Sequence, residues 1–418
     1  MRDRLRRTVA FAAVMVPLAA GTSAVSASKV LGHAALRPQC GDPYSSARDG
    51  SNPLMLATAP GSNPLSGARF FLDGPRHGSA ASAIATLLGL NPNSFPDSYS
   101  WSSFEQGPLR VSLLGHPTLT SNVAQLEKIA GQPETQRLSS YARGGGPGAV
   151  YDQAQKLFCH NFSADPGSIP VIDTYFLIPS VPRCPSPRAV AAAGPGFRRQ
   201  VNEMALATGN RPVVFLLEVD AIGTSRCLQR KGALPKWEAA LRYEVKVLGS
   251  LPHTVTYLEA GYSDANSPRY TAKVLNASGV RTIRGFFTND THNNWTIDEI
   301  RWGERVSRLT GGAHFIVNTA TNGRGPLLNP HPSKQGIEDL CNPPGRGLGP
   351  APRTSPIDPT TGRPFAGVDA FLWTAPPGNS TGRCNGGPPP ASFWVAGALG
   401  LASRANGQLG PGYPSAPY

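Results

Sequence analysis

Short apolar runs rich in β-branched and aromatic residues alternate with segments of helical periodicity along most of this chain. Such alternation is typical of βαβ units and a parallel sheet. We therefore predict an α/β fold, a distorted parallel β/α barrel of about seven strands, with a doubly wound open sheet as the alternative. The expected strands are 69–73, 169–178, 213–220, 254–261, 282–289, 313–320 and 369–375, and the expected helices are 79–89, 146–158, 189–207, 236–249, 268–278 and 296–310.

The N-terminal residues predict export. The basic stretch MRDRLRR precedes the apolar run VAFAAVMVPLAAG, and small residues follow at Val25, Ser26 and Ala27. A membrane anchor is the alternative, but the apolar run is shorter than the roughly 20 residues that a span needs. We expect a secreted protein without a membrane span, divided into a signal peptide (1–27), a leader (28–62), the folded domain (63–405) and a tail (406–418).

Charge and cysteine content narrow the possible partners. The formal net charge is +13, but Lys and Arg are scattered without a dense tract interleaved with aromatic residues, so we expect no nucleic-acid partner. Six cysteines in an exported chain indicate three disulfides, for which arithmetic allows fifteen pairings. They lack the paired Cys-x-x-Cys spacing of a zinc site. We therefore expect neither a metal nor a cofactor, and we expect a monomer.

Polar residues follow several of the predicted strands. VVFLLEVD is followed by AIGTS, TYLEAG by YSDAN, and GFFTN by DTHNN. In an α/β barrel the active site lies at the C-terminal ends of the strands, on the loops that follow them. These loops are therefore where we expect the functional residues.

The C-terminal part of the sequence carries a specific resemblance. LCNPPGRGLGPAP (340–352) and VDAFLWTAPPGNSTGRC (368–384) resemble the signature of glycoside hydrolase family 6. Upstream, VVFLLEVDAIG, TVTYLEAGYS, RGFFTND and HFIVNTATNGRG resemble further blocks of that family, in the family's order, and the resemblance extends from about residue 63 to residue 402. It implies the family's distorted parallel barrel with long loops over the strand ends. It also implies a secreted hydrolase that cleaves β-1,4-glucan with inversion.

Inverting glycosidases hold a carboxylic acid at the leaving-group oxygen and a carboxylate base on the opposite face of the sugar, with water between base and sugar. The resemblance implies that Asp220 is the acid. Glu218 stands two residues earlier, so we expect both side chains on one side of the strand, where Glu218 orients Asp220, raises its pKa or satisfies a buried network. Tyr175 matches a strand position where the family keeps a Tyr near the scissile sugar.

The base position departs from the family pattern. Thr381 stands where the family's proposed base Asp would be, and Asn379 stands where the family has Glu. A neutral hydroxyl cannot accept the proton of water as a carboxylate does. The family's Arg-Asp-Cys, whose Asp assists the acid, reads Pro182-Arg183-Cys184. Four other carboxylates are candidate replacement bases: Asp173, Asp264, Asp290 and Glu259.

Several sugar-binding positions have changed as well. The family's stacking Trp, its Lys before Pro-Pro-Gly, its His after Ala-Gly and an Asp are replaced in turn by Leu340, Ala375, Tyr262 and Asn318. The family's residues are retained at Asn289, Asn342 and Arg346. We expect the substrate to be contacted by Asn289, Tyr262, Asn379 and Thr381.

The resemblance also implies two disulfides, Cys184–Cys227 and Cys341–Cys384. Cys40 and Cys159 remain and would form a third, which the resemblance does not supply. The alternative function is a catalytically impaired family 6-like protein that binds a polysaccharide or has a structural role.

Overall fold

The computed structural model describes residues 62–139, 146–326 and 341–415. The predicted signal peptide, nearly all of the leader, Cys40 and Leu340 lie outside these ranges. Among the described residues, no helix combines the length and the apolar character that a bilayer span requires.

A single curled sheet of eight strands forms the centre of the described domain, in the order β1-β2-β3-β4-β5-β6-β8-β7. All neighbouring pairs are parallel except β7 with β8, which is antiparallel. The described strands include no pairing of β1 with β7, so the sheet is an open half-barrel. The strands are β1 (Gln136–Ser139), β2 (Val171–Tyr175), β3 (Val213–Leu217), β4 (Thr254–Glu259), β5 (Gly285–Thr288), β6 (His314–Asn318), β7 (Arg353–Thr354) and β8 (Val368–Leu372).

The predicted parallel α/β barrel is confirmed, with two corrections at its edges. The expected strand at 69–73 is reduced to one bridge, in which Phe70 pairs in parallel with Ile169. The sheet also contains β1, whose sequence QRLS has no apolar run, and the two-residue strand β7. Neither of these short strands was predicted.

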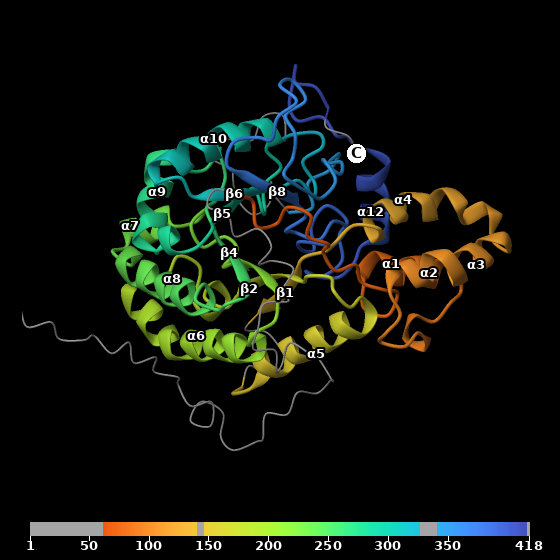
Figure 1. The fold of residues 1–418 in the computed structure, drawn as a ribbon, viewed down its shortest axis with the longest axis horizontal. Coiled ribbons are helices and arrows are strands. Elements are labelled where there is room, and N and C mark those ends of the chain that lie inside the picture. The colour runs from red at the N-terminus through yellow and green to blue at the C-terminus, as the bar shows by residue number, and fades with distance from the viewer. Residues whose placement is uncertain (1–61, 140–145, 327–340, 416–418) are drawn as a thin grey trace, which may run out of the picture. The chain divides into compact units, whose positions relative to one another are not determined.

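Helices connect successive strands and cover the outside of the sheet (Figure 1). Along this outer layer α5 contacts α6, α6 contacts α8, α8 contacts α9, and α9 contacts α10. The periodicity of α8 explains its position, because its apolar residues Trp237, Leu241, Val245 and Leu248 recur at helical spacing and are all buried. The helices of this layer are α5 (Ala149–Ala164), α6 (Pro187–Thr208), α7 (Arg226–Arg230), α8 (Leu234–Leu248), α9 (Pro268–Ala277) and α10 (Thr296–Leu309).

A second group of helices, which includes α12, packs together and against the residues that follow β8. Its core is apolar and includes Trp101, Phe104, Leu126 and Trp373. In Figure 1 this group lies beside the helical layer that covers the sheet. Its helices are α1 (Ser79–Leu87), α2 (Trp101–Phe104), α3 (Arg110–Leu114), α4 (Thr120–Ala130) and α12 (Val395–Ser403).

The sheet is buried on both faces, as is usual for parallel strands covered by helices. Every residue of β3 and β8 is buried. The concave side holds an apolar cluster to which several strands contribute, including Val214, Leu216, Tyr257, Phe287 and Ile316. This packed interior fixes the ends of the strands relative to one another and so fixes the loops that follow them.

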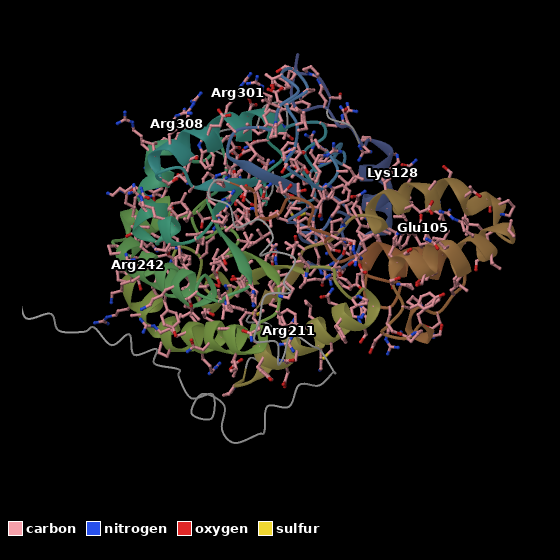
Figure 2. The ribbon with its side chains drawn as sticks, in the orientation of Figure 1. Glu105, Lys128, Arg211, Arg242, Arg301 and Arg308 are labelled. Carbon is pink, nitrogen blue, oxygen red and sulfur yellow. A yellow bond between two sulfur atoms is a disulfide. The ribbon has the colours of Figure 1, made fainter. Side chains whose placement is uncertain are left out.

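Basic side chains are spread over separate elements, as the scattered sequence pattern predicts. Lys128 belongs to α4, Arg242 to α8, and Arg301 and Arg308 to α10 (Figure 2).

Candidate active site

Asp220 lies just beyond the C-terminal end of β3, where the chain turns sharply. Its backbone is left-handed, with φ of +64°. Its Oδ1 accepts hydrogen bonds from the hydroxyls of Tyr262 and Thr291, the latter at 2.8 Å. Its Oδ2 has no hydrogen-bond partner among the described residues, and this atom is not fully buried. One carboxyl oxygen is therefore held by the protein while the other contacts solvent.

Tyr262 is buried and directs its polar end at Asp220. Burial first, and then the negative charge of Asp220, raise the pKa of the Tyr262 phenol well above its usual value. The phenol therefore stays protonated and donates to the carboxylate. Gly223 makes room for the ring, because a Cβ at that position would lie 2.6 Å from a Tyr262 ring carbon.

The turn after Asp220 is held by Glu259 at the end of β4. Its Oε2 accepts hydrogen bonds from the amides of Ile222 at 2.6 Å and Gly223 at 3.1 Å. Glu259 is fully buried, and burial together with the charge of Asp220 raises its pKa well above the usual value. Glu259 therefore supports the loop of Asp220 from beneath, and water does not reach it.

Glu218 belongs to a buried network separate from Asp220. β3 ends at Leu217 and Glu218 has a φ of +52°, so the alternation of a strand does not extend to Asp220. The expectation that the two side chains share one strand face is therefore wrong. The Glu218 carboxyl accepts from the amides of Phe176 at 2.7 Å and Leu177 at 2.9 Å, and burial raises its pKa to about 8. Glu218 therefore accepts the backbone hydrogen bonds of the turn after β2. Of the three roles expected for it, this is the satisfaction of a buried network.

Arg137 joins two of the candidate replacement bases. Its guanidinium forms a forked pair with Asp173, with Nε and Nη2 at 2.8 and 2.7 Å from Oδ2, and its Nη2 lies 3.7 Å from Asp290 Oδ2. It also lies over the ring of Tyr175, 5.5 Å from the centroid. Since Arg137 and Asp173 are register partners on β1 and β2, the pairing follows directly from the sheet. Arg137 was not predicted because β1 was not recognised.

Neither Asp173 nor Asp290 is exposed. Burial raises the pKa of Asp173 even though Arg137 opposes the change. Burial likewise raises the pKa of Asp290 to about 7, again against the charge of Arg137. Asp290 Oδ1 accepts a hydrogen bond from the Thr374 hydroxyl, while its Oδ2 has no hydrogen-bond donor within the described part of the chain. Both carboxyls are thus buried, and Asp290 lies close enough to Asp220 to be affected by its charge.

Asp264 is the candidate base with the largest access to solvent, with 37 % of its side chain exposed. Its carboxylate faces His292, whose Nδ1 lies 3.0 and 3.1 Å from the two oxygens. The His292 ring stacks on Tyr262, with centroids 3.6 Å apart. His292 and Thr291 were not singled out in the sequence, although both lie in the loop DTHNN that follows β5.

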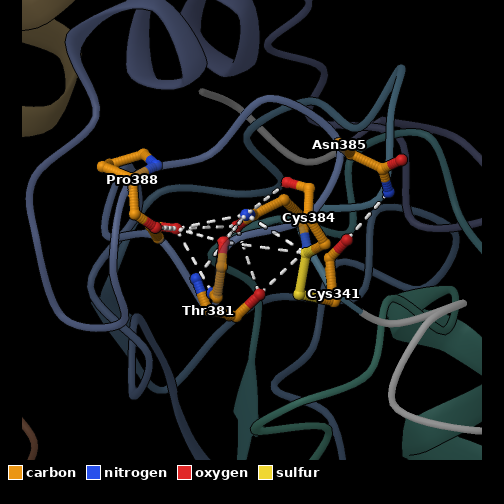
Figure 3. Close-up of a disulfide and its surroundings, with 8 residues drawn as sticks. Cys341, Thr381, Cys384, Asn385 and Pro388 are labelled. Atoms are coloured by element: carbon orange, nitrogen blue, oxygen red, sulfur yellow. Dashed lines mark hydrogen bonds between the residues drawn. A yellow bond between two sulfur atoms is a disulfide. The ribbon is translucent and has the colours of Figure 1, made fainter.

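Thr381 lies beside the Cys341–Cys384 disulfide (Figure 3), and its loop is held by hydrogen bonds to Asn342. The Thr381 hydroxyl accepts from the Asn342 amide at 2.9 Å, and Asn342 Oδ1 accepts from the Thr381 amide at 2.9 Å. The Asn342 side-chain amide also donates to the Gly382 carbonyl at 2.7 Å. Thr381 is exposed, so its loop is braced from within while the side chain remains at the surface.

Asn289, one of the expected substrate contacts, forms its hydrogen bonds inside the protein. Asn289 is fully buried, and its amide donates to the carbonyls of Asn294 and Asn318, both at 3.1 Å. Asn318 donates in turn to the carbonyl of Asn289 at 2.9 Å. Arg346 donates to the carbonyl of Gly325. Asn289 and Asn318 thus link the ends of β5 and β6. Their burial and internal bonds do not leave Asn289 available to a sugar.

Asn379 lies at the turn that leads to Thr381 and is partly buried. It forms an isolated antiparallel bridge with Phe393, and its side-chain Oδ1 is buried without a hydrogen bond from any residue that the structure describes. Its position next to the braced loop is compatible with the predicted contact to substrate, which stays a prediction.

Comparison with known proteins identifies the family. The profile described as Glycosyl hydrolases family 6 matches residues 196–392. Endoglucanase 1 of Streptomyces sp. (strain KSM-9) is 30 % identical over 281 residues, which cover 66 % of this chain and 70 % of that protein. The chain belongs to glycosyl hydrolase family 6. The matched segment contains Asp220, Tyr262, His292 and Thr381.

Further family 6 relatives agree with the fold. Endoglucanase A of Cellulomonas fimi is 30 % identical over 282 residues, 68 % of this chain, and the chain spans 56 % of the length of that relative. The structure of the endoglucanase Cel6 from Mycobacterium tuberculosis matches with a TM-score of 0.59 and 26 % identity, covering 82 % of this chain and 99 % of the other. A family 6 enzyme of Orpinomyces sp. Y102, 20 % identical, matches in fold with a TM-score of 0.60.

Both disulfides that the family resemblance implied are present in the structure. Cys184 pairs with Cys227, with Cα atoms 5.7 Å apart, and Cys341 pairs with Cys384 at 6.1 Å. Cys159 is also disulfide-bonded. Its predicted partner Cys40 lies outside the described residues.

Proposed function

We propose that this family 6 protein is a secreted, monomeric glycosidase that cleaves β-1,4-glucan with inversion, with Asp220 as the general acid. Family membership supports the glycosidase chemistry, and the named relatives are endoglucanases. The observation that carries the assignment is the asymmetric setting of Asp220, whose Oδ1 is held by Tyr262 and Thr291 while Oδ2 accepts no hydrogen bond from the described residues. The disulfides support an extracellular location.

The setting of Asp220 suits proton delivery to a leaving group. A general acid must hold its proton on an oxygen that reaches the glycosidic oxygen. Hydroxyl donors at Oδ1 fix the carboxyl plane and leave Oδ2 to carry the proton. Tyr175 ends β2, the strand next to β3, and the Arg137 guanidinium lies over its ring, so we expect a sugar bound beside Asp220 to contact Tyr175.

The catalytically impaired, polysaccharide-binding function is the second candidate. It is favoured by Thr381, which stands at the family's proposed base position and whose hydroxyl is bonded to Asn342. The two functions differ in turnover, since a binding protein would retain affinity for glucan chains without hydrolysing them.

Hydrolysis of a panel of soluble β-glucans and cello-oligosaccharides separates the two functions. The parent protein should release reducing ends from β-1,4-glucan, and Asp220→Asn should lower kcat by about 10² to 10⁴ because it removes the general acid. Asp152→Asn is the matched control, since Asp152 is exposed on α5 and should leave activity unchanged. Binding without turnover by the parent would favour the second candidate.

A further inference from the structure

His292 and Asp264 form a hydrogen-bonded pair close to Asp220. The family resemblance does not imply this pair. Asp264 lies in the loop after β4 and His292 in the loop after β5, so adjacent strands bring them together. The carboxylate faces Nδ1 at 3.0 Å and is fixed further by the side-chain amide of Asn294 at 2.8 Å. Burial acts in the opposite direction, but the hydrogen bond of His292 holds the pKa of Asp264 below its usual value.

The second ring nitrogen of His292 is left free. When Nδ1–H donates to Asp264, Nε2 carries the lone pair of the neutral ring. Among the described residues none forms a hydrogen bond with Nε2, and this atom is not fully buried. The side chain retains 16 % exposure, so the nitrogen can meet a water molecule. A carboxylate that fixes the tautomer and orientation of an imidazole is the arrangement that general bases use.

This pair is tied to Asp220 by direct contacts. The His292 ring stacks on Tyr262 at 3.6 Å, and the Tyr262 hydroxyl bonds to Asp220. Its chain neighbour Thr291 also bonds to Asp220, at 2.8 Å. The Tyr262 ring therefore links His292 to the acid, through the stacking contact on one side and the hydroxyl on the other.

We propose that His292, oriented by Asp264, is the general base of this protein and replaces the carboxylate missing at Thr381. The inference rests on the proposed glucanase function. His292 is the catalytic residue in this assignment, and Asp264 is a positioning residue.

The proposed step balances without any further reactant. His292 Nε2 takes a proton from water as the water oxygen bonds to the anomeric carbon. The bond from that carbon to the glycosidic oxygen breaks, and Asp220 Oδ2 gives its proton to the departing oxygen. The products are two sugar fragments with one water added. Exchange with solvent then removes the proton from His292 and returns one to Asp220.

The other carboxylates are less suited to this role. Glu259 is buried and caps the turn at Ile222 and Gly223, and Asp173 is buried against Arg137. Asp290 is 3 % exposed, so water does not reach it in this structure. His292 thus combines a free acceptor atom, an orienting carboxylate and access to water.

The variants His292→Ala, His292→Gln and Asp264→Asn test the assignment on cello-oligosaccharides. Both His292 variants should lower kcat by about 10² to 10⁴, and Asp264→Asn should lower it less, because the imidazole remains. His292→Gln preserves a donor to Asp264, so it keeps the loop in place if the alanine variant fails to fold. His116→Ala is the control, since His116 is exposed at the end of α3.

Azide distinguishes a base from a structural residue. The azide anion carries no proton to remove, so it should restore turnover of His292→Ala and yield a glycosyl azide of inverted configuration. It should not restore Asp220→Asn on a substrate with a poor leaving group. Retained activity in His292→Ala and His292→Gln, or lost activity that azide does not restore, would overturn the inference while leaving Asp220 as the acid. A parent that hydrolyses no β-1,4-glucan would instead refute the proposed function.

Discussion

The hydroxyl of Tyr262 donates to Asp220 Oδ1 at the position where the family blocks have a His. Thr291 supports the same oxygen, and its hydroxyl lies 2.6 Å from that of Tyr262. The acid is therefore held by two neutral hydroxyls from the loops after β4 and β5. Removing these hydroxyls one at a time should show how much the orientation of Asp220 contributes to the rate, apart from its proton transfer.

Tyr262→Phe should lower kcat by roughly tenfold or less while leaving KM nearly unchanged. The ring still stacks on His292 and Thr291 still holds Asp220, so only one hydrogen bond to the acid is lost, worth about 0.5–1.5 kcal/mol, which corresponds to roughly tenfold or less. Steady-state kinetics on a soluble glucan measure both constants. A loss as complete as that of Asp220→Asn would mean that the Tyr262 hydroxyl itself transfers a proton.

Asp290→Asn should stabilise the protein increasingly as the pH rises. The folded-state pKa of Asp290 is about 7, raised from 3.8 mainly by burial, so its protonated form is favoured in the fold. This contribution to stability is fully present below about pH 3.8 and is lost as the pH rises through 7. The difference corresponds to roughly 4 kcal/mol at most.

Thermal unfolding of the parent and Asp290→Asn between pH 4 and pH 8 measures this effect. The Tm of the variant should exceed that of the parent at pH 8, and the gap should shrink toward pH 4. Asn keeps the oxygen that accepts from Thr374, and Asp173 keeps its pair with Arg137. A gap that widens toward pH 4 would show that the ionised carboxylate stabilises the fold.

Much of this architecture could be predicted from the sequence, because the buried strands are continuous apolar runs with helices between them. The missed strand β1 has one fully buried apolar residue, Leu138, and so gives no periodic signal. The expected strand at 69–73 failed because only Phe70 meets a neighbouring strand before the chain turns.

The site was only partly predictable for a related reason. Asp220, Tyr262 and Glu259 follow recognisable strand ends. The pairing of Arg137 with Asp173 depends on the register between β1 and β2, and β1 was not predicted. The stacking of His292 on Tyr262 depends on the conformation of two loops. Patterns of hydrophobicity encode strand order, but they do not encode the conformation of loops.

Thr381→Asp should raise kcat on soluble β-1,4-glucan above that of the parent. If this loop faces the sugar, the new carboxylate would stand across from Asp220 at a separation of roughly 6.5 to 9.5 Å, which leaves room for water. The brace of Asn342 and the Cys341–Cys384 disulfide should preserve the loop. Asn379→Glu and Ala375→Lys can be added to restore the family pattern.

Thr381→Asn is the matched neutral control and should give no increase. The Asp variant should also recover part of the activity lost in His292→Ala, since both groups would serve as base. No increase in a correctly folded Thr381→Asp protein carrying the two further changes would mean that this loop does not face the scissile bond.

Non-reduced peptide mapping of the purified protein should find Cys40 joined to Cys159. Cys159 is already disulfide-bonded, and the other four cysteines pair with one another. A free thiol at Cys40 or an intermolecular bridge would contradict this pairing.

We propose Asp220 as the acid of an inverting β-1,4-glucanase. Proton NMR of cello-oligosaccharide hydrolysis, recorded before the products mutarotate, tests it most directly when parent and Asp220→Asn are compared. We expect the parent to release the α-anomer first at the new reducing end and Asp220→Asn to release almost none. Initial release of the β-anomer, or undiminished hydrolysis by Asp220→Asn, would contradict it.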